Sequence, residues 1–352
     1  MILFYILLLL VSFYLLTKIC DEYFVNSLDR ISHKLKLSSE VAGATLMAVG
    51  SSAPELFVSL TALLKPGNHG AIGAGTIVGS AIFNILVIIG GSLMVRKAFI
   101  SWQPVVRDLA FYSISIFMLL FAFQDGIVNI YEALAFIVTY IIYIVAVLNW
   151  KKLLKYEDQV DPYEHVAEEM KKEEKRWRKF TFIFDVIVEK TFPVAEKFYL
   201  VFAISIVWII ALSWVLVESA VATAHILGIP EVIIGLTILA AGTSIPDLVS
   251  SLIVAKQGRS DMAVTNAVGS NIFDILFGLG FPWIIYIAFF QQNIVVDNES
   301  LYSSIVLLFA TVVTIAFLFL MQKWKLGRRS GLFLIALYVA YIVWLIVRTY
   351  LG

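Results

Sequence analysis

Long apolar runs separated by short polar segments are the main feature of this 352-residue chain. A helix that crosses a bilayer needs about 20 mostly apolar residues. Ten runs approach or exceed that length, and they predict spans at residues 2–19, 38–63, 71–94, 105–124, 128–149, 198–220, 230–255, 262–290, 301–321 and 330–350. We therefore expect an all-α membrane protein with ten transmembrane helices.

The composition supports a bilayer as the solvent of these runs. Hydrophobic residues make up 61% of the chain and charged residues 15%, whereas a soluble domain is about 45–50% apolar. The first run has no basic segment before it and no small-residue cleavage site after it, so we interpret it as a retained span. The single cysteine, Cys20, cannot form an internal disulfide. We expect the lipid bilayer as partner, no nucleic acid and no cofactor, and the sequence does not indicate an oligomeric state.

The Lys and Arg residues are sorted between the two sides of this topology. Counted along the sequence, 24 of the 26 fall in loops on one side, and only Lys65 and Arg348 fall on the other. Cytosolic loops of membrane proteins carry such an excess of basic residues. We therefore expect a multi-pass protein of the cell membrane with both termini on the non-cytosolic side. The longest polar stretch, residues 151–197, is interpreted as a solvated cytosolic loop.

Two segments of the first half recur in the second half. Residues 43–60 align without gaps on residues 235–252 with nine identities in 18, and residues 78–90 align on 268–280 with eight in 13. The matched positions are mostly not leucines and include Gly, Ser, Pro, Asn/Asp and Glu/Asp, which apolar helices do not share by chance. Because each half holds five spans, an odd number, the second half enters the membrane from the opposite side, which predicts two inverted-topology repeats.

These repeats define the expected domain organisation. The first five-helix repeat covers residues 1–150 and contains the motif 43–90. The charged loop 151–197 follows, and the second five-helix repeat covers residues 198–352 with the motif 235–280.

Each motif places a proline within a predicted span. Proline lacks an N–H and clashes with the carbonyl four residues earlier, which belongs to Gly50 for Pro54 and to Gly242 for Pro246. We expect both helices to break or kink there and to expose backbone oxygens. Inside a membrane such irregular backbone is tolerated only against protein or a wet cavity.

The repeated motifs place three carboxylates, Glu55, Asp247 and Asp274, in predicted spans that contain no Lys or Arg. A carboxylate at the bilayer centre costs about 3 kcal/mol and by default marks an ion or proton path. Helical spacings of three and four residues place further polar side chains on the same faces: Ser51, Ser52, Ser59, Thr243, Ser244, Ser251, Ser80, Ser270 and Asn84. If antiparallel repeats bring these faces together, the result is a cluster of oxygen ligands without Cys or His.

Oxygen ligands of this kind favour alkali and alkaline-earth cations over zinc or copper. The hydroxyl residues have an alternative role, because small hydroxyl side chains also form hydrogen bonds between packed helices. The residues alone leave both roles open.

The paired motifs resemble the two alpha repeats of the cation/Ca²⁺ exchanger superfamily. The segments Gly50–Glu55, Gly75–Asn84, Ala241–Asp247 and Asp261–Asp274 are most similar to the K⁺-dependent Na⁺/Ca²⁺ exchanger branch, as is the stretch around Trp102–Asp108. The resemblance covers both motif pairs, and the ten-span plan covers nearly the whole chain. The short central loop, without a long acidic insert, favours a compact, prokaryotic member.

The resemblance implies a secondary antiporter, not an enzyme, that exchanges Na⁺ for Ca²⁺ by alternating access, with K⁺ as a further candidate ion. Glu55 and Asp247 would be the central Ca²⁺/Na⁺ carboxylates, and Asp274 matches the position linked to K⁺ use. The other implied ligands are Ser51, Ser52, Thr243, Ser244, Asn84, Ser80, Ser270 and the carbonyls of Ala48 and Ala240. The first and sixth spans would slide across this core.

The residues leave three other functions as alternatives. A Ca²⁺/H⁺ antiporter is the nearest alternative. The motifs of such antiporters resemble Gly-Asn-Ala-(Ala/Thr)-Glu, a pattern that this chain lacks at Gly50 and Gly242. A cation channel is the second alternative. An inverted repeat that closes on a carboxylate cluster favours alternating access over a channel. An intramembrane aspartyl protease needs two aspartates and a Gly-x-Gly-Asp motif, whereas one of the central carboxylates here is Glu55.

Overall fold

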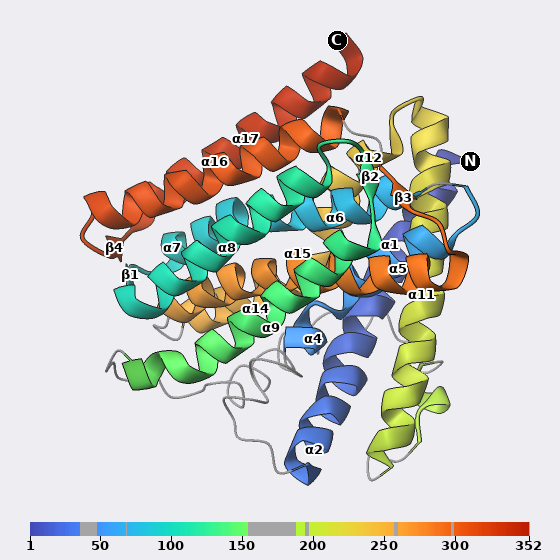
Figure 1. Cartoon of the computed structure of the whole chain (residues 1–352), viewed down its shortest axis with the longest axis horizontal. Coiled ribbons are helices and arrows are strands. Elements are labelled where there is room, and N and C mark those ends of the chain that lie inside the picture. Colours follow the sequence, from blue (N-terminus) through green and yellow to red (C-terminus); the bar gives the residue numbers. More distant parts are fainter. Residues whose placement is uncertain are drawn as a thin grey trace.

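The protein is described here from a computed structural model, which defines residues 1–35, 48–67, 69–153, 188–193, 197–256, 260–296 and 299–351. Long helices packed side by side make up almost all of this structure (Figure 1). Most of the predicted cytosolic loop, residues 151–197, lies outside the described residues.

The first half of the chain forms helices with short irregular or π-helical (η) turns between some of them. Its elements are α1 (Ile2–Ile19), η1 (Cys20–Val25), α2 (Asn26–Lys34), α4 (Ala48–Ser51), α5 (Ala53–Leu64), α6 (Gly70–Phe83), η3 (Asn84–Ile88), α7 (Ile89–Val95), β1 (Ala98–Phe99), α8 (Trp102–Ala122), β2 (Ile127–Val128) and α9 (Ile130–Leu153).

The second half follows a similar order. Its elements are α11 (Phe198–Leu227), α12 (Glu231–Ile234), η4 (Gly235–Leu239), α13 (Ala240–Thr243), α14 (Ile245–Lys256), α15 (Ser260–Phe290), β3 (Ile294–Val295), α16 (Glu299–Met321), β4 (Lys325–Leu326) and α17 (Arg328–Leu351).

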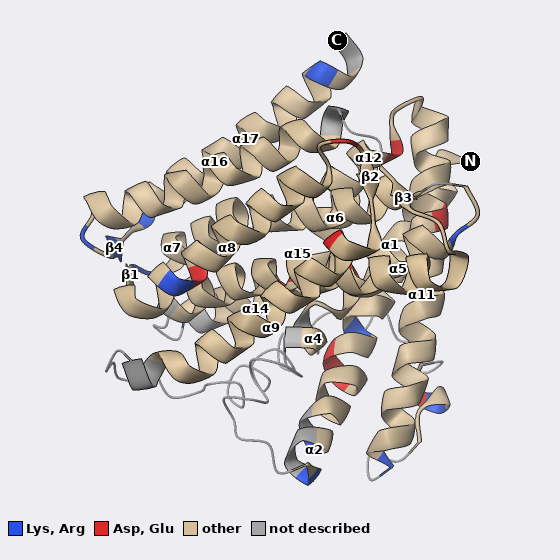
Figure 2. Cartoon of the chain, in the orientation of Figure 1, with Lys and Arg blue, Asp and Glu red and all other residues tan. Residues whose placement is uncertain are grey.

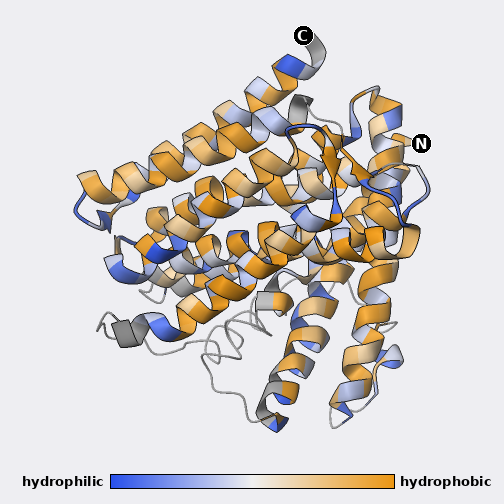
Figure 3. Cartoon of the chain, in the orientation of Figure 1, coloured by the Kyte–Doolittle hydropathy of each residue, from blue (hydrophilic) through white to orange (hydrophobic). Residues whose placement is uncertain are grey.

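Within the described residues, nine helical segments are long and apolar enough to cross a membrane. Lys and Arg lie mainly at helix ends and in the connections, and apolar residues dominate the helix middles (Figures 2 and 3). The remaining predicted span, 38–63, which is the second along the chain, is described only from residue 48 onward, where α5 is a shorter apolar helix. A mostly helical structure with several candidate membrane spans is thus confirmed, and the ten-helix inverted repeat stays a prediction.

Two helices extend further than the hydropathy pattern predicted. The first span continues through η1 into α2, and the sixth continues to Leu227 instead of ending near residue 220. The first extension passes charged residues, and Lys18 and Glu22 form an ion pair of 3.8 Å one turn apart. Polar residues end an apolar run without ending a helix, because backbone hydrogen bonds do not depend on the side chains.

The two proline-directed breaks are confirmed. Ser52 separates α4 from α5 with φ −98° and ψ 15°, and Ser244 separates α13 from α14 with φ −89° and ψ 0°. Each serine lies two residues before its proline. Because Pro54 and Pro246 have no N–H to donate, the helices restart in a new turn at these points.

Short antiparallel pairs join the two halves at opposite ends of the bundle (Figure 1). In one pair Ala98 faces Leu326, and in the other Ile127 faces Val295. The first pair joins two loops that were predicted on one side of the membrane, and the second joins two loops predicted on the other. The pairing therefore agrees with the expected order of the spans.

The middle of the bundle is held together by close contact between α6 and η4. A Cβ atom added at Gly79 would lie 2.4 Å from the Leu236 carbonyl oxygen, and one added at Gly235 would lie 2.7 Å from that of Ile72. Small residues allow membrane helices to approach this closely. The motif glycines therefore fix the distance between the two halves next to the motif carboxylates.

Gly79→Ala should lower the melting temperature of the purified protein by several degrees, because the added methyl forces the α6 and η4 backbones apart. Overpacking of this kind costs about 1–3 kcal/mol. The matched control is Gly269→Ala at the repeat-equivalent position, where the nearest atom to an added Cβ is the Tyr143 hydroxyl at 3.8 Å. Equal melting temperatures for the two variants would contradict the close-contact interpretation.

Candidate cation-binding site

The two helix breaks place a carboxylate at the start of each new helix. Glu55 lies in the first turn of α5 and Asp247 in the first turn of α14. The N-terminus of a helix carries a partial positive charge and unpaired N–H groups, which favour a nearby anion. The local sequence, Ser followed two residues later by Pro and then the carboxylate, thus creates the same arrangement twice.

The carboxylates are buried among the helices. Glu55 is 2% exposed, Asp274 1% and Asp247 8%. Within the described residues, none of the oxygens of Glu55 or Asp274 accepts a hydrogen bond. Buried polar atoms almost always have a partner, so these four oxygens are available as ligands for a cation.

Two hydroxyl pairs cross between the halves at the same level. Ser52 and Ser270 are joined by a hydrogen bond of 3.2 Å, and Ser80 and Ser244 by one of 2.7 Å. In the repeat alignment Ser52 corresponds to Ser244 and Ser80 to Ser270. The two bonds are therefore equivalent, and each links a helix break of one half to the second motif of the other.

These hydroxyls lie beside the carboxylates. Ser80, Ser244 and Thr243 are next to Glu55, although their geometry does not reach that of a hydrogen bond to its oxygens. Ser52 and Ser270 are next to Asp274, and Ser270 is also next to Asp247. The predicted residues are thus brought together from both halves.

The three carboxylates are within electrostatic range of one another, but they do not form a compact ligand group. In the described ranges no three His, Cys, Asp or Glu side chains are close enough to hold one metal ion. Hydroxyl groups lie between the carboxylates, as Ser270 does between Asp247 and Asp274. Any cation held here would need hydroxyl, amide or carbonyl oxygens as well, as is usual for Ca²⁺.

Backbone and hydroxyl groups of α13 are partly engaged already. The Ala240 carbonyl accepts hydrogen bonds from the Ser244 N–H at 3.2 Å and the Thr243 hydroxyl at 3.4 Å, and Thr243 also donates to Leu239 O at 3.0 Å. Thr243 keeps oxygen lone pairs free to face a cation because it acts as a donor. The side chains of Ser51 and Ala48 are outside the described set.

The sequence interpretation missed Asn271, which binds the predicted ligand Asn84. Asn84 is buried at 0% exposure and donates from Nδ2 to Oδ1 of Asn271 at 2.9 Å. Asn271 in turn donates to the Ala81 carbonyl at 3.1 Å and to the Tyr112 hydroxyl at 2.9 Å. Asn271 corresponds to Ala81 in the repeat alignment, so a comparison that follows matching positions passes over it.

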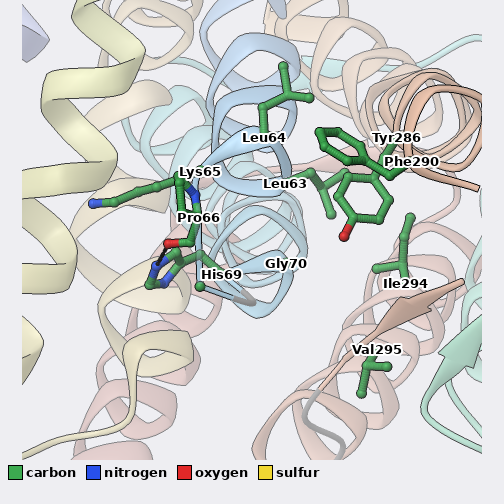
Figure 4. Close-up of a pocket in the computed structure, with 11 residues that line it drawn as sticks. Leu63, Leu64, Lys65, Pro66, His69, Gly70, Tyr286, Phe290, Ile294 and Val295 are labelled. Atoms are coloured by element: carbon green, nitrogen blue, oxygen red, sulfur yellow. Dashed lines mark hydrogen bonds between the residues drawn. The ribbon is translucent and has the colours of Figure 1, made fainter. Parts of the chain in front are cut away.

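A separate cavity of about 260 Å³ lies at one end of α5 (Figure 4). Leu63, Tyr286 and Ile294 lie around it, and none of the predicted cation ligands lines it. Lys65 points away from it toward α11, where it pairs with Glu218 at 2.5 Å. The cavity is therefore distinct from the carboxylate cluster, which is closed to solvent in this conformation.

Comparison with known proteins adds the decisive observation. The family model described as "Sodium/calcium exchanger protein" matches residues 5–149 and 197–347, which is well over half of the chain. The chain belongs to the sodium/calcium exchanger family. The two matched segments flank the central charged loop.

Named relatives of this family member include "Sodium/potassium/calcium exchanger 1" of Gallus gallus, 28% identical over 94% of this chain and 76% of the relative. "Sodium/potassium/calcium exchanger 5" of Homo sapiens is 31% identical over 93% of this chain and 80% of the relative. The resemblance to the cation/Ca²⁺ exchanger superfamily is thus confirmed. The protein is a multi-pass integral membrane transporter of this family.

Two solved structures share the fold. The sodium-calcium exchanger NCX_Mj, soaked with Na⁺ and Sr²⁺, aligns with a TM-score of 0.57 at 22% identity and covers 97% of this chain and 99% of its own. The H⁺/Ca²⁺ exchanger CAX aligns with a TM-score of 0.70 at 14% identity over 96% and 82%. At these identities the likeness establishes the fold alone.

Glu55→Gln should raise the melting temperature of this exchanger-family protein in buffer free of Na⁺, K⁺ and Ca²⁺. The change removes one of three buried carboxylates that lie within electrostatic range of one another, and the new amide can donate to the neighbouring hydroxyls. Stabilising substitutions at functional sites typically yield about 1 kcal/mol. The measurement is thermal unfolding followed by tryptophan fluorescence.

Asp125→Asn is the control for this test. Asp125 is exposed and accepts the Ile127 N–H at 3.0 Å, which an asparagine oxygen can also accept, so its melting temperature should not change. A fall in melting temperature for Glu55→Gln would mean that the carboxylate is compensated in the empty protein.

Proposed function

We propose that this protein is a secondary antiporter that exchanges Na⁺ for Ca²⁺ by alternating access at the buried carboxylate site. One observation carries the proposal: the oxygens of Glu55 and Asp274 are buried, have no hydrogen-bond partner in the described structure and face hydroxyls from both halves. Such oxygens suit hard cations that are released again.

The ions follow from the family and from the named relatives. The family is that of sodium/calcium exchangers, and the matched relatives are named for sodium, potassium and calcium. We assign Ca²⁺ and Na⁺ as competing substrates of one site and K⁺ as a third ion. Three carboxylates balance one Ca²⁺ with one K⁺, or three Na⁺.

Within this proposal each residue has a stated role. Glu55 and Asp247, at the two helix starts, are the central Ca²⁺/Na⁺ ligands, and Asp274 is the K⁺-linked ligand. The supporting oxygens come from Ser51, Ser52, Ser80, Asn84, Thr243, Ser244, Ser270 and the carbonyls of Ala48 and Ala240.

An inverted repeat suits alternating access, because two equivalent halves around one site can exchange their arrangements. The equivalent bonds Ser52–Ser270 and Ser80–Ser244 support this symmetry. The first and sixth spans are the candidate moving part. The helices α1 and α11 pack against each other at one edge of the bundle (Figure 1), in an apolar cluster that also includes residues of α5.

The membrane orientation is part of the same proposal. Both termini lie on the non-cytosolic side, and residues 151–197 form the cytosolic loop between repeats 1–150 and 198–352. The sorted Lys and Arg residues support this orientation.

Proton coupling is the second candidate, and one observation favours it: the fold is shared with the H⁺/Ca²⁺ exchanger CAX at the higher TM-score of 0.70. Against it stand the family match and the Ser-rich motifs at Gly50 and Gly242.

Purified protein in Na⁺-loaded liposomes should take up radiolabelled Ca²⁺, and choline-loaded liposomes should not. Glu55→Ala and Asp247→Ala should each reduce this uptake at least tenfold, because each removes a charged ligand, whereas Asp125→Asn should transport like the parent protein. Ca²⁺ uptake that survives Glu55→Ala would overturn the site assignment. Uptake driven by a pH gradient and indifferent to Na⁺ would select the proton-coupled candidate.

External K⁺ should stimulate the same uptake if Asp274 binds this ion. Asp274→Asn should abolish the stimulation and leave a smaller, K⁺-independent uptake, because the amide keeps one ligand oxygen and loses the charge. Initial rates are measured across a series of K⁺ concentrations with Na⁺ and Ca²⁺ fixed. A parent protein that is indifferent to K⁺ would restrict the proposal to Na⁺ and Ca²⁺.

A further inference from the structure

The two second motifs differ at five of their 13 aligned positions, and at two of these the difference changes a polar side chain. The first half has Ala81 and Asn84, and the second half has Asn271 and Asp274 at the equivalent positions. A carboxylate has two equivalent acceptor oxygens, whereas an amide has one acceptor and one donor end. Asn84 can therefore serve as a cation ligand only in one of its two orientations.

The surrounding hydrogen bonds select that orientation. A backbone carbonyl can only accept, so the Asn271 group that faces Ala81 O at 3.1 Å must be its Nδ2. The Oδ1 of Asn271 then faces Asn84 and requires a donor, which is the Nδ2 of Asn84 at 2.9 Å. The Oδ1 of Asn84 is left turned the other way, buried and without a partner in the described structure.

Tyr112 completes this arrangement from another helix. Its hydroxyl, on α8, accepts the second N–H of Asn271 at 2.9 Å. Tyr112, Asn271 and Asn84 are all 0% exposed, so no solvent competes for these bonds. The Ala81 carbonyl selects the orientation of the Asn271 amide, because it can only accept. The Tyr112 hydroxyl, which can accept or donate, adds the second bond that holds the amide in place.

We propose that Tyr112 is a positioning residue that acts through Asn271 to keep the Asn84 oxygen turned toward the transported cation. The three side chains are called the amide lock. The second half needs no equivalent, because either oxygen of Asp274 can bind. This inference rests on the proposed function, since it assigns Asn84 as a ligand of the transported cation.

A direct effect of Tyr112 on Asp274 is the competing explanation, because the Asp274 charge is within electrostatic range of the tyrosine. The two explanations differ in what Tyr112 needs in order to act. The amide lock requires an amide at residue 84, whereas a direct effect on Asp274 does not.

Tyr112→Phe should raise the Ca²⁺ concentration for half-maximal uptake about five- to tenfold, the size of one lost buried hydrogen bond. The maximal rate should stay within about twofold, because the fold and the carboxylates are retained. The matched control is Tyr341→Phe on α17, which removes a buried hydroxyl that has no hydrogen-bond partner among the described residues and should leave both values unchanged. An unchanged half-maximal concentration in Tyr112→Phe would overturn the proposal.

The deciding experiment repeats Tyr112→Phe in an Asn84→Asp protein. Aspartate supplies two equivalent oxygens, so the orientation of residue 84 no longer matters. Asn271 Oδ1 loses its donor in both members of this comparison, so the tyrosine change itself should add less than twofold. An equal five- to tenfold shift in this background would show that Tyr112 acts directly on Asp274 or on packing.

Failure of the proposed function is distinguishable from failure of the lock. The parent protein without Na⁺-dependent Ca²⁺ uptake would refute the exchanger function whatever the variants do. A transporting parent protein whose Tyr112→Phe variant behaves like Tyr341→Phe would refute only the lock.

Discussion

A carboxylate inside a membrane protein is stable only when a positive charge or a set of donors compensates it. Glu55 and Asp274 have neither among the described residues, and the helices that carry them contain no Lys or Arg. Beyond the partial positive charge of the helix starts, the compensation must then come from outside the chain, as a bound cation or a proton. This constraint explains why closely packed helices surround a group of oxygens that do not satisfy one another.

The scaffold meets this constraint by combining tight packing with broken helices. Gly79 and Gly235 bring the backbones of the two halves into contact, and the breaks at Ser52 and Ser244 turn new helix starts toward the same region. The helix starts offer partial positive charge to the carboxylates when no ion is present. Packing therefore sets the distance between ligands, and the breaks set which ligands are presented.

Much of this arrangement could be predicted from the sequence, and the reasons for the exceptions are physical. Proline chemistry predicted both breaks, because the lost hydrogen bond is a local property of Pro54 and Pro246. Helix ends beyond charged residues, as at α2, were missed. Hydropathy indicates which side chains prefer lipid to water, and it does not indicate where backbone hydrogen bonding ends. Asn271 was missed because its role depends on contacts with Asn84 and Tyr112, which spacing along one helix cannot reveal.

Symmetry and its violation carry different information in such a protein. The bonds Ser52–Ser270 and Ser80–Ser244 obey the repeat, so they belong to the framework that both halves share. Asn84 and Asp274 break it, and only the amide is accompanied by a network that selects one orientation. A duplicated site that binds one asymmetric set of ions must become unequal somewhere. At residue 84 the first half has an amide where the second half has a carboxylate. This is the position that needs supporting side chains, namely Asn271 and Tyr112.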